Sequence, residues 1–272
     1  MADKYIKDVE GGENTNPDGT EAIELDNGTD SEWVRINNLF DGAPTSGDTI
    51  YFNGTKWARL SAESAGWVSL SATWTYASAT SFTVAGDLTT FFVRSLKIGL
   101  TQTTAKYFQV VSSSYSAPNT TVVISGGDDY SLANAAITSP RYSRDENPYG
   151  FPASFAWTPT SGGFSVSPTT LTCKFRLYSF GIYTEILATG GTSNANSFTL
   201  TAPPGVTLSS NATLGIMLIT IDNGSVVTTT PGKLLSNSDS PPKYSITKDF
   251  PGNAWTTSGT KGARFIGFHL LP

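Results

Sequence analysis

An Asn-Gly pair followed closely by a tryptophan occurs twice in the first sixty residues. Asn27-Gly28-Thr29 precedes Trp33-Val34-Arg35-Ile36, and Asn53-Gly54-Thr55 precedes Trp57-Ala58-Arg59-Leu60. Asn-Gly supplies the positive φ angles of a type I′ turn, and the residues after it alternate between two faces, so each copy predicts a β-hairpin. Two strands alone are marginally stable in water, so units this small must stack on each other or on neighbouring subunits. The repeat therefore favours an assembling protein over an enzyme.

The composition predicts an all-β, modular protein. Charged residues make up only 14 % of the 272 residues, and no helical spacing of apolar residues occurs beyond residue 70. Alternating runs, as at residues 106–111 and 197–200, are typical of strands instead. We expect an N-terminal docking segment at 1–45, a hairpin module that forms a shaft or collar at 46–70, a small β-barrel or meander at 71–160, and a jelly-roll-like C-terminal β-sandwich at 161–272.

Acidic residues are concentrated at one end of the chain. Residues 1–66 hold thirteen acidic and five basic residues, a balance of −8, which leaves +3 for residues 67–272. The start of the chain has too little apolar surface to offset its ordering entropy, so we expect it to order against a partner. Basic residues are not clustered, which argues against nucleic acid, and no run approaches the roughly 20 apolar residues that span a bilayer, which argues against membrane insertion.

Candidate catalytic residues are few. Cys173, the only cysteine, lies in a strand-like run and is predicted to be a buried structural thiol. His269, the only histidine, lies in the apolar run 264–271, and we expect it at a strand edge or a subunit contact. Asp128-Asp129 and Asp145-Glu146 could supply a glycosidase pair, but adjacent residues of a strand face opposite sides. We therefore expect no enzyme, no catalytic residue, no cofactor and no metal.

The sequence beyond residue 80 predicts two sets of strands. In the middle module we expect strands near residues 82–84, 91–98, 107–112 and 120–124, with one short helix at 131–137. An extended, proline-rich connector follows at 142–157. The expected C-terminal strands are 171–180, 184–188, 197–201, 213–221, 226–229 and 263–271. The run 214–221 is almost continuously apolar, as expected of a strand covered on both sides.

Residues 72–155 resemble a module of tail-fibre and other virion structural proteins of tailed bacteriophages. The matching runs are 73–88, 100–108, 134–137 and 147–152. Residues 47–60 are also similar to a short motif of phage fibre shafts and collars, Gly-Asp, an aromatic residue, Gly and Trp. This resemblance implies a homotrimeric tail fibre or tail-associated protein of the virion, anchored to other virion proteins by its N-terminal segment. A head fibre or capsid decoration protein is the alternative within this class.

Four side chains are candidate contacts. A two-stranded hairpin has no interior, so Trp33 and Trp57 are predicted to occupy equivalent places and to be buried between subunits. Tyr244 and Trp255 lie in expected turns beside short polar residues, a mixture that suits a host-surface glycan, although Trp255 could instead close the base of the sandwich. A carbohydrate-binding module or a polysaccharide depolymerase is the alternative from another class.

Overall fold

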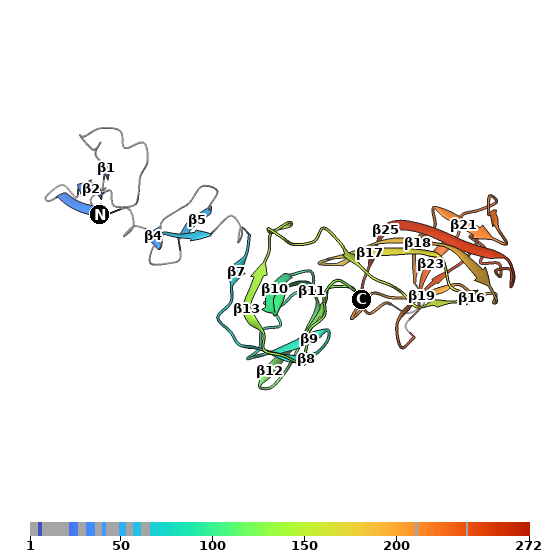
Figure 1. Cartoon of the computed structure of the whole chain (residues 1–272), viewed down its shortest axis with the longest axis horizontal. Helices are drawn as coiled ribbons and strands as arrows, with labels where there is room; N and C mark the ends of the chain where they lie inside the picture. Colours follow the sequence, from blue (N-terminus) through green and yellow to red (C-terminus); the bar gives the residue numbers. More distant parts are fainter. Residues whose placement is uncertain are drawn as a thin grey trace. The chain divides into compact units, whose positions relative to one another are not determined.

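The chain forms two compact units built from β-strands (Figure 1). The computed structural model describes residues 66–209, 212–237 and 239–272 in full and, within residues 1–65, only the backbone of six short strands. The first unit holds Met1–Trp67 and Pro148–Gly150, and the second holds Val68–Asn147 and Phe151–Pro272. All regular elements among the described residues are strands, which confirms the all-β class. Those residues include no helix with the length and apolar character that a membrane crossing requires.

The first unit contains two three-stranded sheets, β1-β2-β3 and β4-β6-β5. Their strands are β1 (Tyr5–Ile6), β2 (Ala22–Asp26), β3 (Ser31–Arg35), β4 (Phe40–Asp41), β5 (Thr49–Phe52) and β6 (Trp57–Leu60). The antiparallel pairs β2–β3 and β5–β6 flank the two Asn-Gly sites, which confirms the two predicted hairpins.

The two tryptophans of the repeat stand at different positions in their hairpins. Trp57 is opposite Phe52 in the first residue pair after its turn, whereas Trp33 is opposite Glu24 in the third. The prediction that they occupy equivalent places is therefore wrong, because the second copy is compressed by two residues. Both side chains lie outside the described part of the structure, so their role as oligomer contacts stays a prediction.

The middle of the chain forms one seven-stranded antiparallel sheet in the order β7-β13-β10-β11-β12-β9-β8. Its strands are β7 (Val68–Ser69), β8 (Trp74–Ser78), β9 (Ser81–Ala85), β10 (Lys97–Gln102), β11 (Thr104–Ser116), β12 (Asn119–Ser125) and β13 (Thr138–Ser143). Trp74, Phe82 and Phe92 pack at the centre of its core, with the Trp74 and Phe82 rings stacked at 4.4 Å. The sheet does not close into a barrel. It is not a simple meander either, because β13 lies between β7 and β10, and β9 pairs with β12.

Two local predictions for this region are wrong. The strand expected at 91–98 begins only at Lys97, because the amide of Phe92 donates to the Leu88 carbonyl in a tight turn. The helix expected at 131–137 is absent. There the Gln102 side chain donates to the carbonyls of Ala133 and Ala135 and accepts from the Ala133 amide, which holds this segment in a non-helical conformation. So short a helix has little stability of its own to oppose this.

The C-terminal part consists of two sheets that share one core. The larger has the order β14-β17-β18-β25-β21-β22, with β16 also paired to β18, and the smaller has the order β15-β19-β24-β23-β20. The strands of the larger sheet are β14 (Phe155–Ala156), β16 (Phe164–Val166), β17 (Thr170–Tyr178), β18 (Gly181–Ser193), β21 (Ile219–Asp222), β22 (Ser225–Val226) and β25 (Thr260–Leu270). Those of the smaller sheet are β15 (Ser161–Gly162), β19 (Thr199–Thr201), β20 (Thr213–Ile216), β23 (Lys233–Asn237) and β24 (Lys243–Ile246). Phe175, Ile186 and Phe265 from one sheet meet Leu200 and Leu234 from the other.

The apolar run 214–221 is not one covered strand. It is divided between β20 in the smaller sheet and β21 in the larger, so the chain changes sheet near Met217. Met217 is buried, but Ile216, Leu218 and Ile219 are exposed. The prediction that both sides are covered is therefore wrong, because a strand that switches sheets turns part of its apolar surface outward at the corner.

A column of aromatic rings joins the middle sheet to the C-terminal core within the second unit. Tyr107 contacts Tyr130, Tyr130 contacts Phe155, and Phe155 contacts Phe175, with ring centroids 5.8–6.3 Å apart. Beside this column, Gly127 has a φ of +62°, and a Cβ there would lie 2.0 Å from the Ala156 carbonyl oxygen. Only glycine permits this approach, which brings the turn after β12 against β14.

Candidate association surface

The two residues predicted to contact glycan lie inside the protein. Tyr244 belongs to β24, a strand that the sequence did not reveal, and its side chain is completely buried. Trp255 is also buried, and its Nε1 donates to the Ile246 carbonyl at 2.8 Å. The prediction that these side chains form a surface contact is wrong, and Trp255 instead closes part of the sandwich core.

The two candidate reactive residues are core residues as well. Cys173 is buried, as predicted, and burial raises the pKa of its thiol to about 12. His269 is buried, and desolvation lowers the pKa of its imidazole to about 4. It lies on β25 beyond the last residue that pairs with β21, so the predicted position at a strand edge is confirmed. Its Nε2 lies 3.2 Å from the Tyr244 hydroxyl, and its Nδ1 lies 3.4 Å from the Leu270 carbonyl oxygen. Both ring nitrogens therefore have partners inside the protein.

The carboxylates of the C-terminal part are engaged in local structure. Asp222 accepts hydrogen bonds from Lys248 Nζ at 2.9 Å and from the amide and hydroxyl of Thr256. Asp249 accepts from the amides of Gly252 and Asn253 at 2.9 and 2.8 Å. Although burial acts to raise the pKa of both carboxyls, these hydrogen bonds outweigh it and hold the pKa values below the ordinary range. No group of three potential metal-ligating side chains occurs among the described residues.

The larger C-terminal sheet carries an apolar surface on the side away from its core. Residues directly opposite each other in an antiparallel pair project from the same face. Phe268 is opposite Tyr183, and Leu270 is opposite Gly181 at the end where β17 leads into β18. Tyr178 and Phe180 lie at this same end, and their rings are 5.9 and 5.1 Å from that of Phe268.

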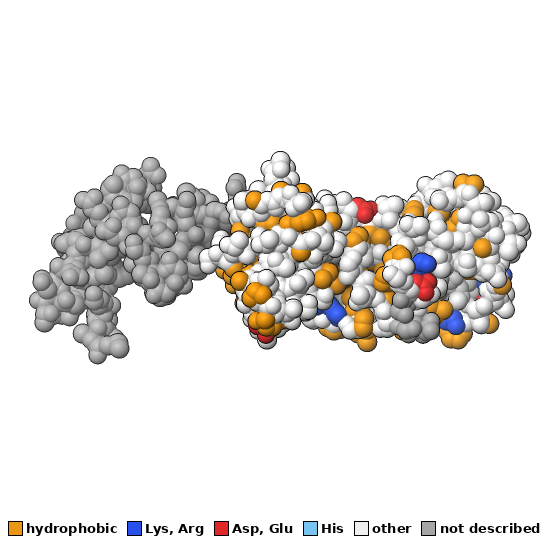
Figure 2. All heavy atoms as spheres, turned by 90° about the horizontal axis from the view of Figure 1, so that it is seen from below, with side chains coloured by type: hydrophobic (Ala, Val, Ile, Leu, Met, Phe, Trp, Pro, Cys, Tyr) orange, Lys and Arg blue, Asp and Glu red, His pale blue; other side chains and the backbone are white. Residues whose placement is uncertain are grey.

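Five large side chains of this surface are each between 38 % and 65 % exposed. They are Tyr178, Phe180, Ile266, Phe268 and Leu270, and we call them the outer face. With roughly 200 Å² for each large side chain, these fractions amount to about 500 Å² of exposed apolar area. The largest apolar patch of an ordinary monomer is of this size and often functional. Figure 2, which views one side of the molecule, shows scattered hydrophobic groups and few charged ones on the described surface.

Two charged side chains that border the outer face, Glu185 and Arg176, are engaged by other groups of the protein. Glu185 is opposite Ile266 and also opposite Lys174, and it accepts a hydrogen bond from the Tyr183 hydroxyl at 2.9 Å. Arg176 donates to the Ala153 carbonyl at 3.1 Å, so its guanidinium is tied to the connector before β14. The outer face therefore offers a mainly apolar contact with polar edges, the usual anatomy of a protein interface.

Sequence reasoning missed the outer face, although the sequence contained a signal for it. Residues 265–271 are apolar at nearly every position, whereas a strand with one face in water should alternate.

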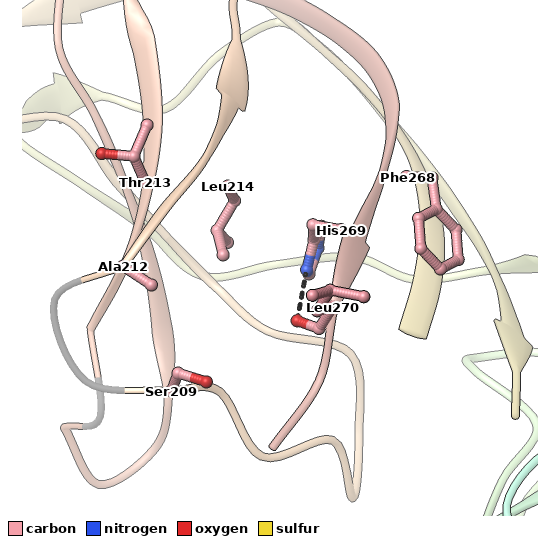
Figure 3. A pocket seen from close by; sticks show the side chains of 7 residues that line it. All are labelled: Ser209, Ala212, Thr213, Leu214, Phe268, His269 and Leu270. Carbon is pink, nitrogen blue, oxygen red and sulfur yellow. Dashed lines mark hydrogen bonds between the residues drawn. The ribbon is translucent and has the colours of Figure 1, made fainter. Parts of the chain in front are cut away.

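A pocket of about 380 Å³ lies where β20 and β25 diverge (Figure 3). Ala212, Thr213 and Leu214 form one wall, Phe268, His269 and Leu270 form the other, and Ser209 lies at one end. We call it the strand wedge. Its described lining contains two hydroxyl groups, apolar side chains and the edge of an internally paired imidazole, and no carboxylate, lysine or arginine is among these residues.

Comparison of the chain with protein-family models, curated proteins and solved structures finds no match. The function of this protein must therefore be inferred from its own residues. The described surfaces offer apolar contact area and unpaired strand edges.

Proposed function

We propose that this protein is a non-enzymatic structural protein of a tailed-bacteriophage virion, a trimeric tail fibre or tail-associated protein. It is anchored to other virion proteins by its acidic N-terminal segment, and its C-terminal domain carries the contact with the host surface. The observation that most favours association of copies is the outer face, because its exposed aromatic rings lie together on one side of the sheet and the largest apolar patch of a chain is often functional. The assignment to phage virions is based on the resemblance of residues 47–155 to phage virion structural proteins.

The outer face of one chain is smaller than a complete protein interface, so association would also bury residues around it. A stable interface buries about 800 Å² on each partner. The outer face would supply the apolar centre of such an interface, and the polar groups of Tyr183, Glu185 and Lys174 would lie toward its rim. Modules with small cores gain stability when neighbouring subunits cover such surfaces.

The mass of the purified protein in sedimentation velocity tests this association. We expect a trimer for the natural chain and a smaller species for the double variant Phe180→Ser with Phe268→Ser. The matched control is Tyr115→Ser with Phe250→Ser, which removes two aromatic rings of similar exposure away from the outer face. A monomeric natural chain, or a trimer that survives the Phe180 and Phe268 changes, contradicts the proposed role of this surface.

Deletion of residues 1–40 tests the anchoring role separately. The charge division predicts a folded protein of unchanged oligomeric state that no longer joins virions. Normal incorporation of the truncated chain into particles would rule out the N-terminal anchor. Electron microscopy of labelled virions would distinguish a tail position from a head-fibre position.

A further inference from the structure

The strand wedge exposes one edge of β25. β21 pairs with β25 only at residues 262–264, whereas β18 pairs along β25 as far as Leu270. Beyond Arg264, therefore, no described strand pairs with the second edge of β25. The chain that could have continued there turns away at Met217 and joins the smaller sheet as β20.

The direction of the unpaired backbone groups follows from two hydrogen bonds. The Arg264 carbonyl accepts from the Leu218 amide at 2.9 Å, on the β21 side. The Leu271 amide donates to the Phe180 carbonyl at 3.3 Å, on the opposite side. Successive residues of a strand direct their backbone groups alternately to its two sides. The N–H and C=O groups of Ile266, Phe268 and Leu270 therefore point to the side away from β18. Of these residues, Phe268 and Leu270 line the wedge, and the Leu270 carbonyl also lies 3.4 Å from His269 Nδ1.

The opposite wall of the wedge is also an edge strand. β20 ends the smaller sheet and pairs only with β23 among the described strands. Natural proteins usually protect such edges with charged residues or proline. Neither β20 nor residues 265–271 contain a lysine, an arginine, a carboxylate or a proline. Two unprotected strand edges therefore flank one open space.

We propose that the strand wedge binds an extended, uncharged peptide segment of another protein, which adds a strand to the free edge of β25. Backbone hydrogen bonds to the N–H and C=O groups of Phe268 and to the Leu270 amide would provide most of the affinity, as in other cases of strand addition. Alternate side chains of the segment would face Leu214 on the inner side and Phe268 on the outer side. Because none of the described residues that line the wedge is charged, a charged segment would lose its hydration without gaining a partner among them. This binding does not depend on the proposed association of copies.

A blocked peptide of alternating threonine and valine, N-methylated at every second residue, is the probe for this site. The methyl groups block the amides along one edge of the peptide. The other edge can still pair with β25, but the peptides cannot assemble into a sheet with each other. We expect it to bind the full chain and to slow hydrogen exchange in the segment 265–271. A peptide methylated at every residue keeps the side chains but lacks the amide donors, and it should not bind.

Two variants locate the binding and separate it from self-association. Thr213→Trp should block the wedge and weaken peptide binding at least tenfold, whereas Thr229→Trp, at another exposed threonine, should leave it unchanged. Absence of binding, or equal binding of the fully methylated peptide, would overturn the proposal. A fall in the mass of the peptide-free protein on Thr213→Trp would also overturn it, because a second copy would then occupy the wedge.

Discussion

The side chain of Gln109 pairs with the backbone of Leu177 in both directions. Its Nε2 donates to the Leu177 carbonyl and its Oε1 accepts from the Leu177 amide, each at 2.8 Å. Gln109 belongs to the middle sheet, Leu177 to the larger C-terminal sheet, and both are buried. One glutamine thus performs the pairing that a strand residue would otherwise make across the boundary between the two modules.

Replacing Gln109 with leucine should weaken this boundary. The change leaves the Leu177 amide and carbonyl buried without partners, at a cost of about 2–4 kcal/mol in the free energy of unfolding. We expect the single unfolding transition in urea to separate into two, one for each module. Ser112→Ala, at an exposed position of the same strand, is the control. A single transition at an unchanged midpoint would show that the rings alone hold the modules together.

Stability should fall as the pH drops from about 6.5 toward 4, because His269 is buried in its neutral form. Its pKa in the folded protein is about 4, below the ordinary histidine value of about 6.5. The unfolded chain therefore binds a proton first, and up to ~3 kcal/mol of stability is lost across this window. Urea unfolding at several pH values measures the slope. His269→Gln should flatten it, and an equal slope in that variant would assign the effect to other groups.

Lys261→Met should destabilise the C-terminal sheets. Lys261 is completely buried, and its Nζ donates to the carbonyls of Gly163, Ala195 and Ser197 at 3.1, 2.9 and 2.8 Å. Methionine has a similar length but donates to none of these carbonyls. The Asn194 amide and the Ser193 hydroxyl still donate to the carbonyls of Gly163 and Ala195, so we expect a loss of about 1–3 kcal/mol. Lys243→Met, which removes a partly exposed lysine, should change the melting temperature little. Equal melting of both variants would show that water replaces the ammonium group.

Cys173 should resist thiol reagents in the folded protein. Burial raises its pKa to about 12, so the thiolate that reacts is rare at pH 8 and has no access to reagent. We expect reaction with a disulfide reagent only at the rate of unfolding, and complete reaction in denaturant. Rapid modification of the native protein would show that this core opens frequently.

Local signals predicted the local structure of this chain. Asn27-Gly28 and Asn53-Gly54 each stand between paired strands, as expected of a residue pair that favours a hairpin. Tyr244 was misplaced because prolines and short polar residues nearby indicated a loop, whereas Lys233–Asn237 and Lys243–Ile246 are paired strands. The positions of Trp255 and of the division at Met217 depend on contacts between distant segments, which turn chemistry and alternation do not encode. The strand wedge forms because the chain changes sheet at Met217, so no single run of residues predicts it.

The run from Thr213 to Asp222 contributes a strand to each sheet, and this has a mechanical consequence. Tension along this run pulls on the ladder between β20 and β23 and on the ladder between β21 and β25 at the same time. A force directed along paired strands loads their hydrogen bonds together instead of opening them one after another. The segment at Met217 would therefore couple the two sheets mechanically. Under a steady force the protein should extend little before the hydrogen bonds of both strand pairs break.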